Sequence, residues 1–180
     1  MGFDQFSFRI KPAIRQLDLA DTVRIEVAIQ YRTRAWQTIE VDLGPVGATS
    51  VDLVDPAIQG LRELGIPVIS PVRCISLSEQ VAQKLHACTA PRTAAARARD
   101  VLDILLIEAL GQLDYASARK SARRVFRERA THDFPPVFAF PPVWHPELAA
   151  LAAELGFPVA DAAEIERRFR ETVRRIAATK

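Results

Sequence analysis

The spacing of apolar residues changes once along this chain, and that change restricts the possible fold more than any other feature. Up to residue 44, apolar and polar residues alternate as they do in half-buried strands. From residue 76 onward, apolar residues recur at intervals of three and four, which is typical of amphipathic helices. This order predicts an α+β protein in which an antiparallel or mixed N-terminal sheet precedes a C-terminal helical bundle.

The same pattern predicts the domain boundaries and the ends of the helices. We expect a sheet region at residues 1–70, with strands over 3–10, 22–31 and 35–44, and a helical region at residues 71–180. A brief extended segment is expected over residues 67–76. Ser76 followed by Glu79 is a capping-box pattern, and Gly111 suits the end of a helix. The predicted helices span residues 55–67, 76–88, 93–110, 114–130, 146–155 and 160–178. A proline-rich connector before the fifth of these is expected to be held by Phe138, Phe140 and Trp144.

Composition excludes some classes of protein. Hydrophobic residues make up 49% of the 180 residues and the net charge is +2, which is ordinary for a globular protein and too weak to indicate nucleic-acid binding by itself. No apolar run approaches the roughly 20 residues that span a bilayer, and the start MGFDQFSFRI lacks the organisation of a signal peptide. Cys74 and Cys88 are expected to be free thiols, so we predict a cytoplasmic protein.

The segment SEQVAQKLHACTAPRTAAARARDVLD places charged residues among apolar helices. Lys84 lies at the edge of an apolar stripe, and Asp100 and Asp103 lie one turn apart on a helix that is otherwise apolar nearly all round. Buried carboxylates need partners. Arg97 is spaced to pair with Asp100, and Arg99 with Asp103. Two interpretations remain open: an ion-paired helix start, or a site where Lys84 and Asp100 face each other beside a nucleotide whose phosphates bind lysine and arginine.

Two further groups of charged residues have both a structural and a functional interpretation. Asp42 is predicted on the polar face of its strand with Trp36, Thr38 and Glu40, as a solvent-facing residue or as a magnesium ligand for nucleotidyl transfer. The helix over 114–130 is strongly basic and would present either a solvated face or a surface for RNA phosphates. Its candidate RNA-binding residues are Arg119, Lys120, Arg123, Arg124 and Arg127.

The central segment resembles the C-terminal signature of the AbiEii/AbiGii nucleotidyltransferase toxin family. In that family a helix of the form E-x-x-A-x-K-L-x-A is followed by an arginine-rich loop and then by R-x-[KR]-D-x-x-D. The matching residues here are Glu79, Ala82, Lys84, Leu85, Ala87, Arg97, Arg99, Asp100 and Asp103. The strand segments and the connector FPPVFAFPPVWHPE are also similar to family members, so the resemblance covers nearly the whole chain.

The resemblance implies a DNA polymerase β-like nucleotidyltransferase fold, a nucleoside triphosphate and Mg²⁺. Such proteins act as toxins in toxin–antitoxin or phage-defence systems, and some relatives modify tRNA 3′ ends. The implied partners are the triphosphate, an antitoxin protein and, as in those relatives, tRNA, with no membrane. Lys84 and Asp100 match the family's catalytic lysine and aspartate. Lys84, Arg97, Arg99 and Asp103 would bind the triphosphate, and Asp42 would be a metal ligand.

The sequence departs from the family pattern before Asp42. Family members carry a Gly-Gly or Gly-Ser turn and a D-x-D strand, and neither motif occurs in this chain. We therefore expect the chain to be N-terminally incomplete, through a truncated gene, a late start codon or a partner chain, and weak or inactive alone because two carboxylates normally hold the metal. The alternatives are a non-catalytic module that binds nucleotide, RNA or antitoxin, and a helical domain whose charged residues only form core ion pairs.

Overall fold

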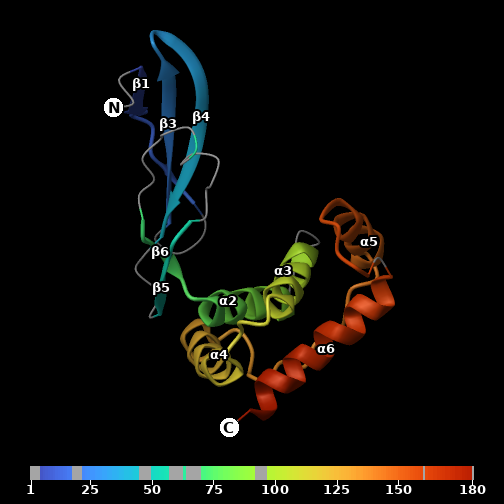
Figure 1. Cartoon of the computed structure of the whole chain (residues 1–180). Coiled ribbons are helices and arrows are strands. Elements are labelled where there is room, and N and C mark those ends of the chain that lie inside the picture. The colour runs from blue at the N-terminus through green and yellow to red at the C-terminus, as the bar shows by residue number, and fades with distance from the viewer. Residues whose placement is uncertain are drawn as a thin grey trace. The chain divides into compact units, whose positions relative to one another are not determined.

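The computed structural model describes residues 5–17, 22–44, 50–56, 63, 70–91, 97–159 and 161–179. The chain divides into two compact units, one formed by residues 1–49 and 54–72 and the other by residues 50–53 and 73–180. We call them the sheet unit and the helical unit, because strands dominate the described part of the first and helices that of the second (Figure 1). The predicted α+β class is confirmed.

The sheet unit contains a four-stranded antiparallel sheet built around one long strand. Strand β4 (Arg34–Leu43) pairs with β3 (Val23–Tyr31) along its length, and β1 (Phe6–Ile10) pairs with the C-terminal half of β3. The short strand β2 (Arg15–Gln16) pairs with the start of β3 and was not predicted from the sequence. The other three strands lie where the alternation places them.

The two faces of this sheet differ in polarity because successive side chains of a strand point to opposite faces. The register confirms one apolar face, formed by Phe8, Ile10, Ile25, Val27, Ile29, Ile39 and Val41. The opposite face carries cross-strand ion pairs, including Lys11 with Glu26 at 2.7 Å. Among the described residues of the sheet unit, no helix covers the apolar face.

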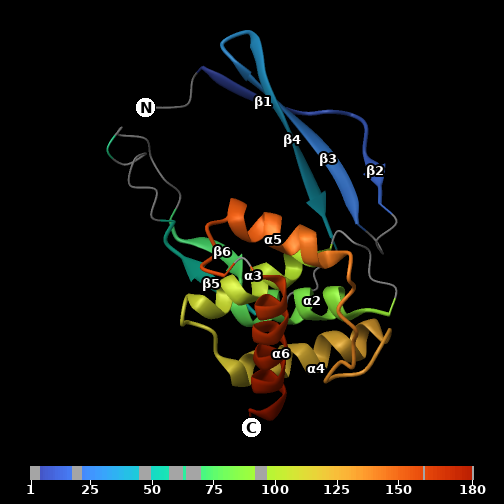
Figure 2. The same ribbon diagram turned by 90° about the vertical axis from the view of Figure 1, so that its right-hand side faces the viewer.

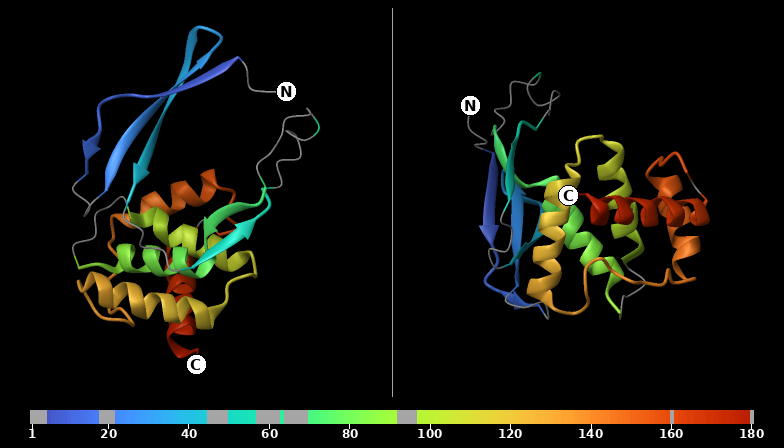
Figure 3. Two further views of the ribbon diagram at one scale, coloured as in Figure 1. Left: turned by 90° about the vertical axis from the view of Figure 1, so that its left-hand side faces the viewer. Right: turned by 90° about the horizontal axis from the view of Figure 1, so that it is seen from below.

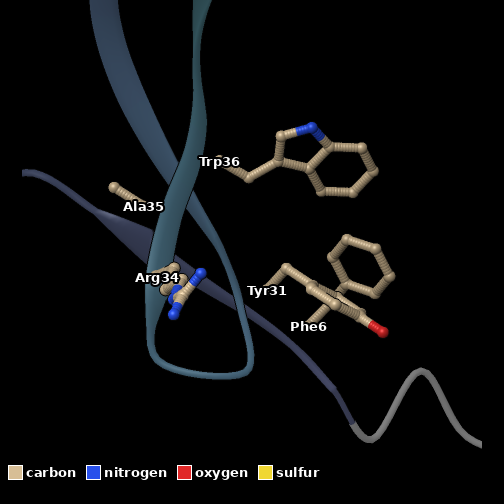
Figure 4. A pocket seen from close by; sticks show the side chains of 5 residues that line it. All are labelled: Phe6, Tyr31, Arg34, Ala35 and Trp36. Atoms are coloured by element: carbon tan, nitrogen blue, oxygen red, sulfur yellow. The ribbon is translucent and has the colours of Figure 1, made fainter.

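A β-bulge moves Trp36 away from its predicted face. The register of β3 and β4 shifts between Ile29 and Gln30, so Trp36 is passed over in the pairing. Its ring lies 4.7 Å from the Phe6 ring and 6.4 Å from the Tyr31 ring, both centroid to centroid (Figure 4). The prediction that Trp36 shares the polar face of Asp42 is therefore wrong. The three rings line a pocket of about 330 Å³.

A second, two-stranded sheet leads into the helices. It consists of β5 (Val51–Val54) and β6 (Val72–Ile75), and the Ser76 amide donates to the Ser50 carbonyl at 3.1 Å. The extended character of β6 follows the sequence prediction, whereas β5 was not anticipated. The helix predicted over residues 55–67 lies outside the described residues, apart from residues 55, 56 and 63.

The helical unit contains the five predicted longer helices, with changes of one or two residues at the ends that the structure describes. Residues 93–96 of the predicted 93–110 helix, and residue 160 of the predicted 160–178 helix, lie outside the described residues. They are α2 (Leu77–Thr89), α3 (Ala98–Ala109), α4 (Tyr115–Arg129), α5 (Trp144–Glu154) and α6 (Ala162–Ala178). The Ser76 hydroxyl caps α2 by accepting from the Glu79 amide, and Asp114 and Asp161 cap α4 and α6. Helices α2 and α4 lie side by side, and α6 crosses α4 (Figures 2 and 3).

The core of the helical unit is built around α3, as its all-round apolar sequence predicts. Val101, Leu102 and Ile104 are fully buried. The proline-rich connector packs on the same core: Trp144 is 1% exposed, and the Phe138 and Phe169 ring centroids lie 5.5 Å apart. The predicted role of the connector aromatics is confirmed, because they pack on the same core as α2 and α3.

The turn after α3 depends on Gly111, whose φ is +68°. A side chain at this position would have no neighbouring atom within 4 Å, so only the backbone conformation opposes a substitution. We expect Gly111→Ala to lower the free energy of unfolding by about 1 kcal/mol, because L-residues disfavour the left-handed region. Gly111→Asn should cost less, since asparagine tolerates this region. Urea denaturation would measure both, and an unchanged midpoint for Gly111→Ala would contradict the argument.

Candidate functional site

Lys84 on α2 lies between two carboxylates of α3. Its Nζ donates to Asp103 Oδ2 at 2.6 Å and to Asp100 Oδ1 at 3.3 Å. The two aspartates are spaced at i and i+3, close to one helical turn, so both project from the same side of α3 toward α2. Their side chains are 14% and 27% exposed, and that of Lys84 is 29% exposed. The sequence prediction that Lys84 and Asp100 face each other agrees with this geometry.

Of the two predicted arginine–aspartate pairs, one is found among the described residues. Arg97 Nη1 donates to Asp100 Oδ2 at 3.3 Å, so the expected pair between these two residues is present. The expected pair between Arg99 and Asp103 is not found: within the part of the chain that the structure describes, Asp103 pairs with Lys84 and Arg99 is exposed without an ion pair. Asp103, which the sequence spacing pairs with Arg99, therefore pairs with Lys84 across the contact between α2 and α3.

The charge state of Lys84 follows from its surroundings. Partial burial lowers the pKa of Lys84, but the hydrogen bond from Lys84 to Asp103 and the charges of Asp103 and Asp100 raise the pKa by more, so the net shift is upward. Lys84 is consequently an ammonium ion at neutral pH. The cluster formed by Lys84, Asp100, Asp103 and Arg97 holds two positive and two negative charges at the edge of a rigid helix pair.

Asp42 occupies a different chemical setting, on the sheet unit. Both of its carboxylate oxygens accept hydrogen bonds from Arg24, from Nε at 2.6 Å and from Nη2 at 2.8 Å. Glu40, two residues earlier on the same face of β4, accepts from Arg24 Nη1 at 2.7 Å. The hydrogen bond from Arg24 is the main reason that the pKa of Asp42 is lowered. Sequence reasoning placed Glu40 on the face of Asp42 but did not name it as a candidate ligand, although the spacing Glu-x-Asp on a strand predicts two carboxylates side by side.

The basic residues of α4 do not form one surface. Arg124 turns inward, where it hydrogen-bonds Glu79 and donates to Glu128 Oε2 at 2.6 Å. Lys120, Arg123 and Arg127 are exposed, and none of them has an ion pair with another described residue. Arg119 is half-buried, and its Nε makes no hydrogen bond to a described residue. Of the five predicted RNA-binding residues, three are therefore exposed, and Arg124 lies partly buried at the interface of α2 with α4.

Glu79 shows that one position of the sequence signature is structural. Its side chain is fully buried at the interface of α2 with α4 and accepts hydrogen bonds from Arg124 and from Gln83 Nε2, the latter at 3.2 Å. Burial raises the pKa of Glu79, but the hydrogen bond and charge of Arg124 lower it by more, so the carboxylate stays ionised. The pair joins α4 to α2, the helix that also carries Lys84.

Cys88 and His86 are two further potential ligands, and burial shifts the pKa of each side chain. Cys88 is buried, and burial raises the pKa of its thiol far above the neutral range. His86 is held uncharged at neutral pH, because burial and the nearby charge of Arg129 lower its pKa to about 4. Across the described ranges, no group of three or more histidine, cysteine, aspartate or glutamate side chains could hold a metal ion. Nor does any described helix combine the length and apolarity needed to cross a membrane.

Comparison with known proteins decides the family. The family model described as "Nucleotidyl transferase AbiEii toxin, Type IV TA system" matches residues 2–177. The chain belongs to the AbiEii family. No curated protein matches it. Membership of the AbiEii family associates the chain with nucleotidyl transfer, with a nucleoside triphosphate and a divalent metal, and with a toxin–antitoxin system that includes an antitoxin partner.

Proposed function

We propose that this chain supplies the triphosphate-binding part of a toxin that transfers a nucleotide from a nucleoside triphosphate to an RNA or protein acceptor. The observation that carries the proposal is the position of Lys84, a charged ammonium held at the helix surface by Asp100 and Asp103. Two carboxylates beside one ammonium, and an Arg99 that forms no ion pair with a described residue, suit a site that exchanges partners when phosphate arrives.

The transfer joins an acceptor oxygen or nitrogen to the α-phosphorus and breaks the bond from that phosphorus to the bridging oxygen, releasing pyrophosphate. The acceptor proton passes to a base. Lys84 would balance negative charge on the triphosphate, and Arg97 and Arg99 would bind phosphate oxygens through their planar guanidinium groups. Asp100 would orient Lys84 and the acceptor, since it already contacts both Lys84 and Arg97.

The described residues fit a magnesium ion only if the triphosphate supplies further ligands. Mg²⁺ is commonly held by one or two carboxylates together with phosphate oxygens and water. Asp100 with Asp103, and Asp42 with Glu40, each form such a pair, whereas no cluster of three acidic or other ligating side chains occurs among the described residues. Bound Mg²⁺ would neutralise charge that develops on the phosphates during transfer. For Asp42 to take part, Arg24 would have to release it.

Catalysis by this chain alone should be weak. The sequence contains no D-x-D motif, so Asp42 lacks the pair of aspartates that accompanies it in relatives with the full pattern. A second function, binding of nucleotide, RNA or antitoxin without transfer, is supported by the same absence. The two functions differ in whether label from the triphosphate reaches an acceptor.

Incubation of the chain with α-labelled triphosphates, Mg²⁺ and total tRNA would test the proposal, alongside calorimetric titration with each triphosphate. We expect binding of a triphosphate, weaker binding of the corresponding monophosphate, and slow transfer that Asp100→Asn abolishes. Transfer that is absent while binding is unchanged by Asp100→Asn would favour the binding module. No binding of any of the common triphosphates at about 1 mM, where even a weak site is half occupied, would refute nucleotidyl transfer and nucleotide binding by this chain, and would leave binding of RNA or antitoxin as the remaining function.

A further inference from the structure

Three aromatic side chains gather on the apolar face of the sheet, close to the turn between β3 and β4. Phe6 and Tyr31 are cross-strand partners and alternate in step with Phe8 and Ile29, so they point to the same apolar face. The bulge adds Trp36, and the three rings lie together on one side of the hairpin (Figure 4). We refer to Phe6, Tyr31 and Trp36 as the aromatic cluster.

The aromatic cluster is open to solvent. Trp36 is 63% exposed and Tyr31 is 41% exposed. The pocket beside the rings has a volume of about 330 Å³. Small-molecule sites begin at about 300 Å³, so this pocket has room for one large side chain. Exposed apolar surface that surrounds a pocket is typical of contact sites for other molecules.

Two arginines give the pocket a positive rim. Arg34 is one of the lining residues, and the Arg32 guanidinium lies 5.5 Å from the centroid of the Tyr31 ring. Both arginines are exposed, and neither forms an ion pair with a described residue. No carboxylate occurs in β1 or between residues 27 and 39. The rim therefore favours a ligand that brings carboxylates of its own.

We propose that the aromatic cluster binds a segment of a partner protein in which one aromatic or leucine side chain is flanked by aspartate or glutamate. The apolar side chain fills the pocket against Tyr31 and Trp36, and the flanking carboxylates accept hydrogen bonds from Arg32 and Arg34. Tryptophan, tyrosine and arginine are the residue types enriched at the positions that carry most of the binding energy in protein interfaces. The pocket combines all three types.

Other occupants fit this surface less well. A single-stranded nucleic acid would stack on the rings, but its phosphates, continuing along the sheet, would lie over Phe8 and Ile10, which are 62% and 61% exposed and carry no charge. A second copy of the chain, bound through the same cluster about a two-fold axis, would place the arginines of both copies near one another. A protein segment avoids both costs, because its apolar and acidic side chains can follow the order of the surface.

The inference goes beyond the function proposed for Lys84 and does not depend on it, because the cluster belongs to the sheet unit and Lys84 to the helical unit. The test is a selection of binders from a phage library of short random peptides, without triphosphate or Mg²⁺. We expect the enriched peptides to combine an aromatic or leucine residue with neighbouring aspartate or glutamate. No enrichment, or enrichment of basic or uncharged peptides, would overturn the proposal. Absence of triphosphate binding would instead refute the function proposed for Lys84.

Trp36→Ser should weaken binding of the selected peptide at least about tenfold, since truncation of a central interface residue has effects of this size. The matched control is Ile14→Ser. Ile14 is 66% exposed in the same unit and does not line the pocket. Fluorescence anisotropy with the labelled synthetic peptide measures both affinities, and circular dichroism checks the fold of both variants. Equal effects of the two variants would overturn the assignment of the pocket.

Arg32→Gln/Arg34→Gln should weaken peptide binding and reduce its dependence on salt, because charge pairs across the interface are lost. This variant keeps the test decisive if Trp36→Ser fails to fold. The control Arg9→Gln/Arg15→Gln removes the same charge from exposed arginines of the sheet unit that do not line the pocket, and it should change neither quantity. Equal effects of the two double variants, tighter binding of a single-stranded oligonucleotide than of the peptide, or dimerisation that Trp36→Ser abolishes would each overturn the proposal.

Discussion

Glu79→Ala is expected to lower the free energy of unfolding of the helical unit by about 3–5 kcal/mol, the cost of leaving one member of a buried ion pair alone. The Glu79 side chain is fully buried and its partner Arg124 is 17% exposed. Removing the carboxylate takes the fully buried partner from the Arg124 guanidinium at the interface between α2 and α4, while the exposed Glu128 stays in place. Urea denaturation followed by helical circular dichroism would measure the change.

The control is Glu128→Ala, which removes the other carboxylate of Arg124. Glu128 is 53% exposed, and exposed pairs contribute at most about 1 kcal/mol. A cost for Glu79→Ala no larger than that of Glu128→Ala would contradict the burial argument. Lowering the pH provides a second check. The pKa of Glu79 is lowered in the folded protein from its ordinary value of 4.5, so its contribution is complete above that value and is lost as the pH falls through the folded-state pKa.

Lys84→Gln is expected to weaken triphosphate binding about 10- to 100-fold, because a hydrogen bond to a charged group contributes about 1.5–3 kcal/mol. The glutamine can still bond to Asp103, so the helix pair keeps a polar contact, but the charge that meets the phosphates is gone. Calorimetric titration in Mg²⁺ measures the loss. A monophosphate should be affected less, since fewer charges depend on the ammonium.

Arg174→Gln is the matched control for Lys84→Gln. Arg174 is exposed on α6 and forms no ion pair with any described residue, so its loss removes one positive charge without touching the cluster. We expect its triphosphate affinity to match the wild type. If Lys84→Gln instead binds triphosphate normally and only loses stability, the lysine and its aspartates are a structural ion-pair cluster, and the triphosphate site lies elsewhere.

The helices could be predicted from the sequence because their signals are local. Ser76, Asp114 and Gly111 mark helix ends through interactions within a few residues, and the apolar period fixes the buried side. Trp36 was misplaced for the opposite reason. Strict alternation assumes an unbroken register, but a bulge depends on the pairing partner, which no window of the sequence reveals.

The features of the candidate site that depend only on the spacing of residues along a helix could be predicted. The choice between competing ion-pair partners could not. The side of α3 that carries Asp100 and Asp103 follows from helical geometry. Whether Asp103 pairs with Arg99 or with Lys84 depends on how α2 and α3 pack. In the structure Asp103 pairs with Lys84. Arg124 was assigned to an RNA surface for the same reason. Nothing local distinguishes it from Arg123, and only the packing of α2 on α4 brings Glu79 within its reach.

The aromatic bulge of β4 gives the molecule a practical property. The sequence has two tryptophans, and each unit contains one of them: Trp36, 63% exposed beside Phe6 and Tyr31, and Trp144, 1% exposed in the helical core. Indole emission depends on solvent contact, so the two chromophores differ in wavelength and in access to quenchers. Replacing either one with phenylalanine leaves a built-in optical reporter for the melting of a single unit, without any attached dye.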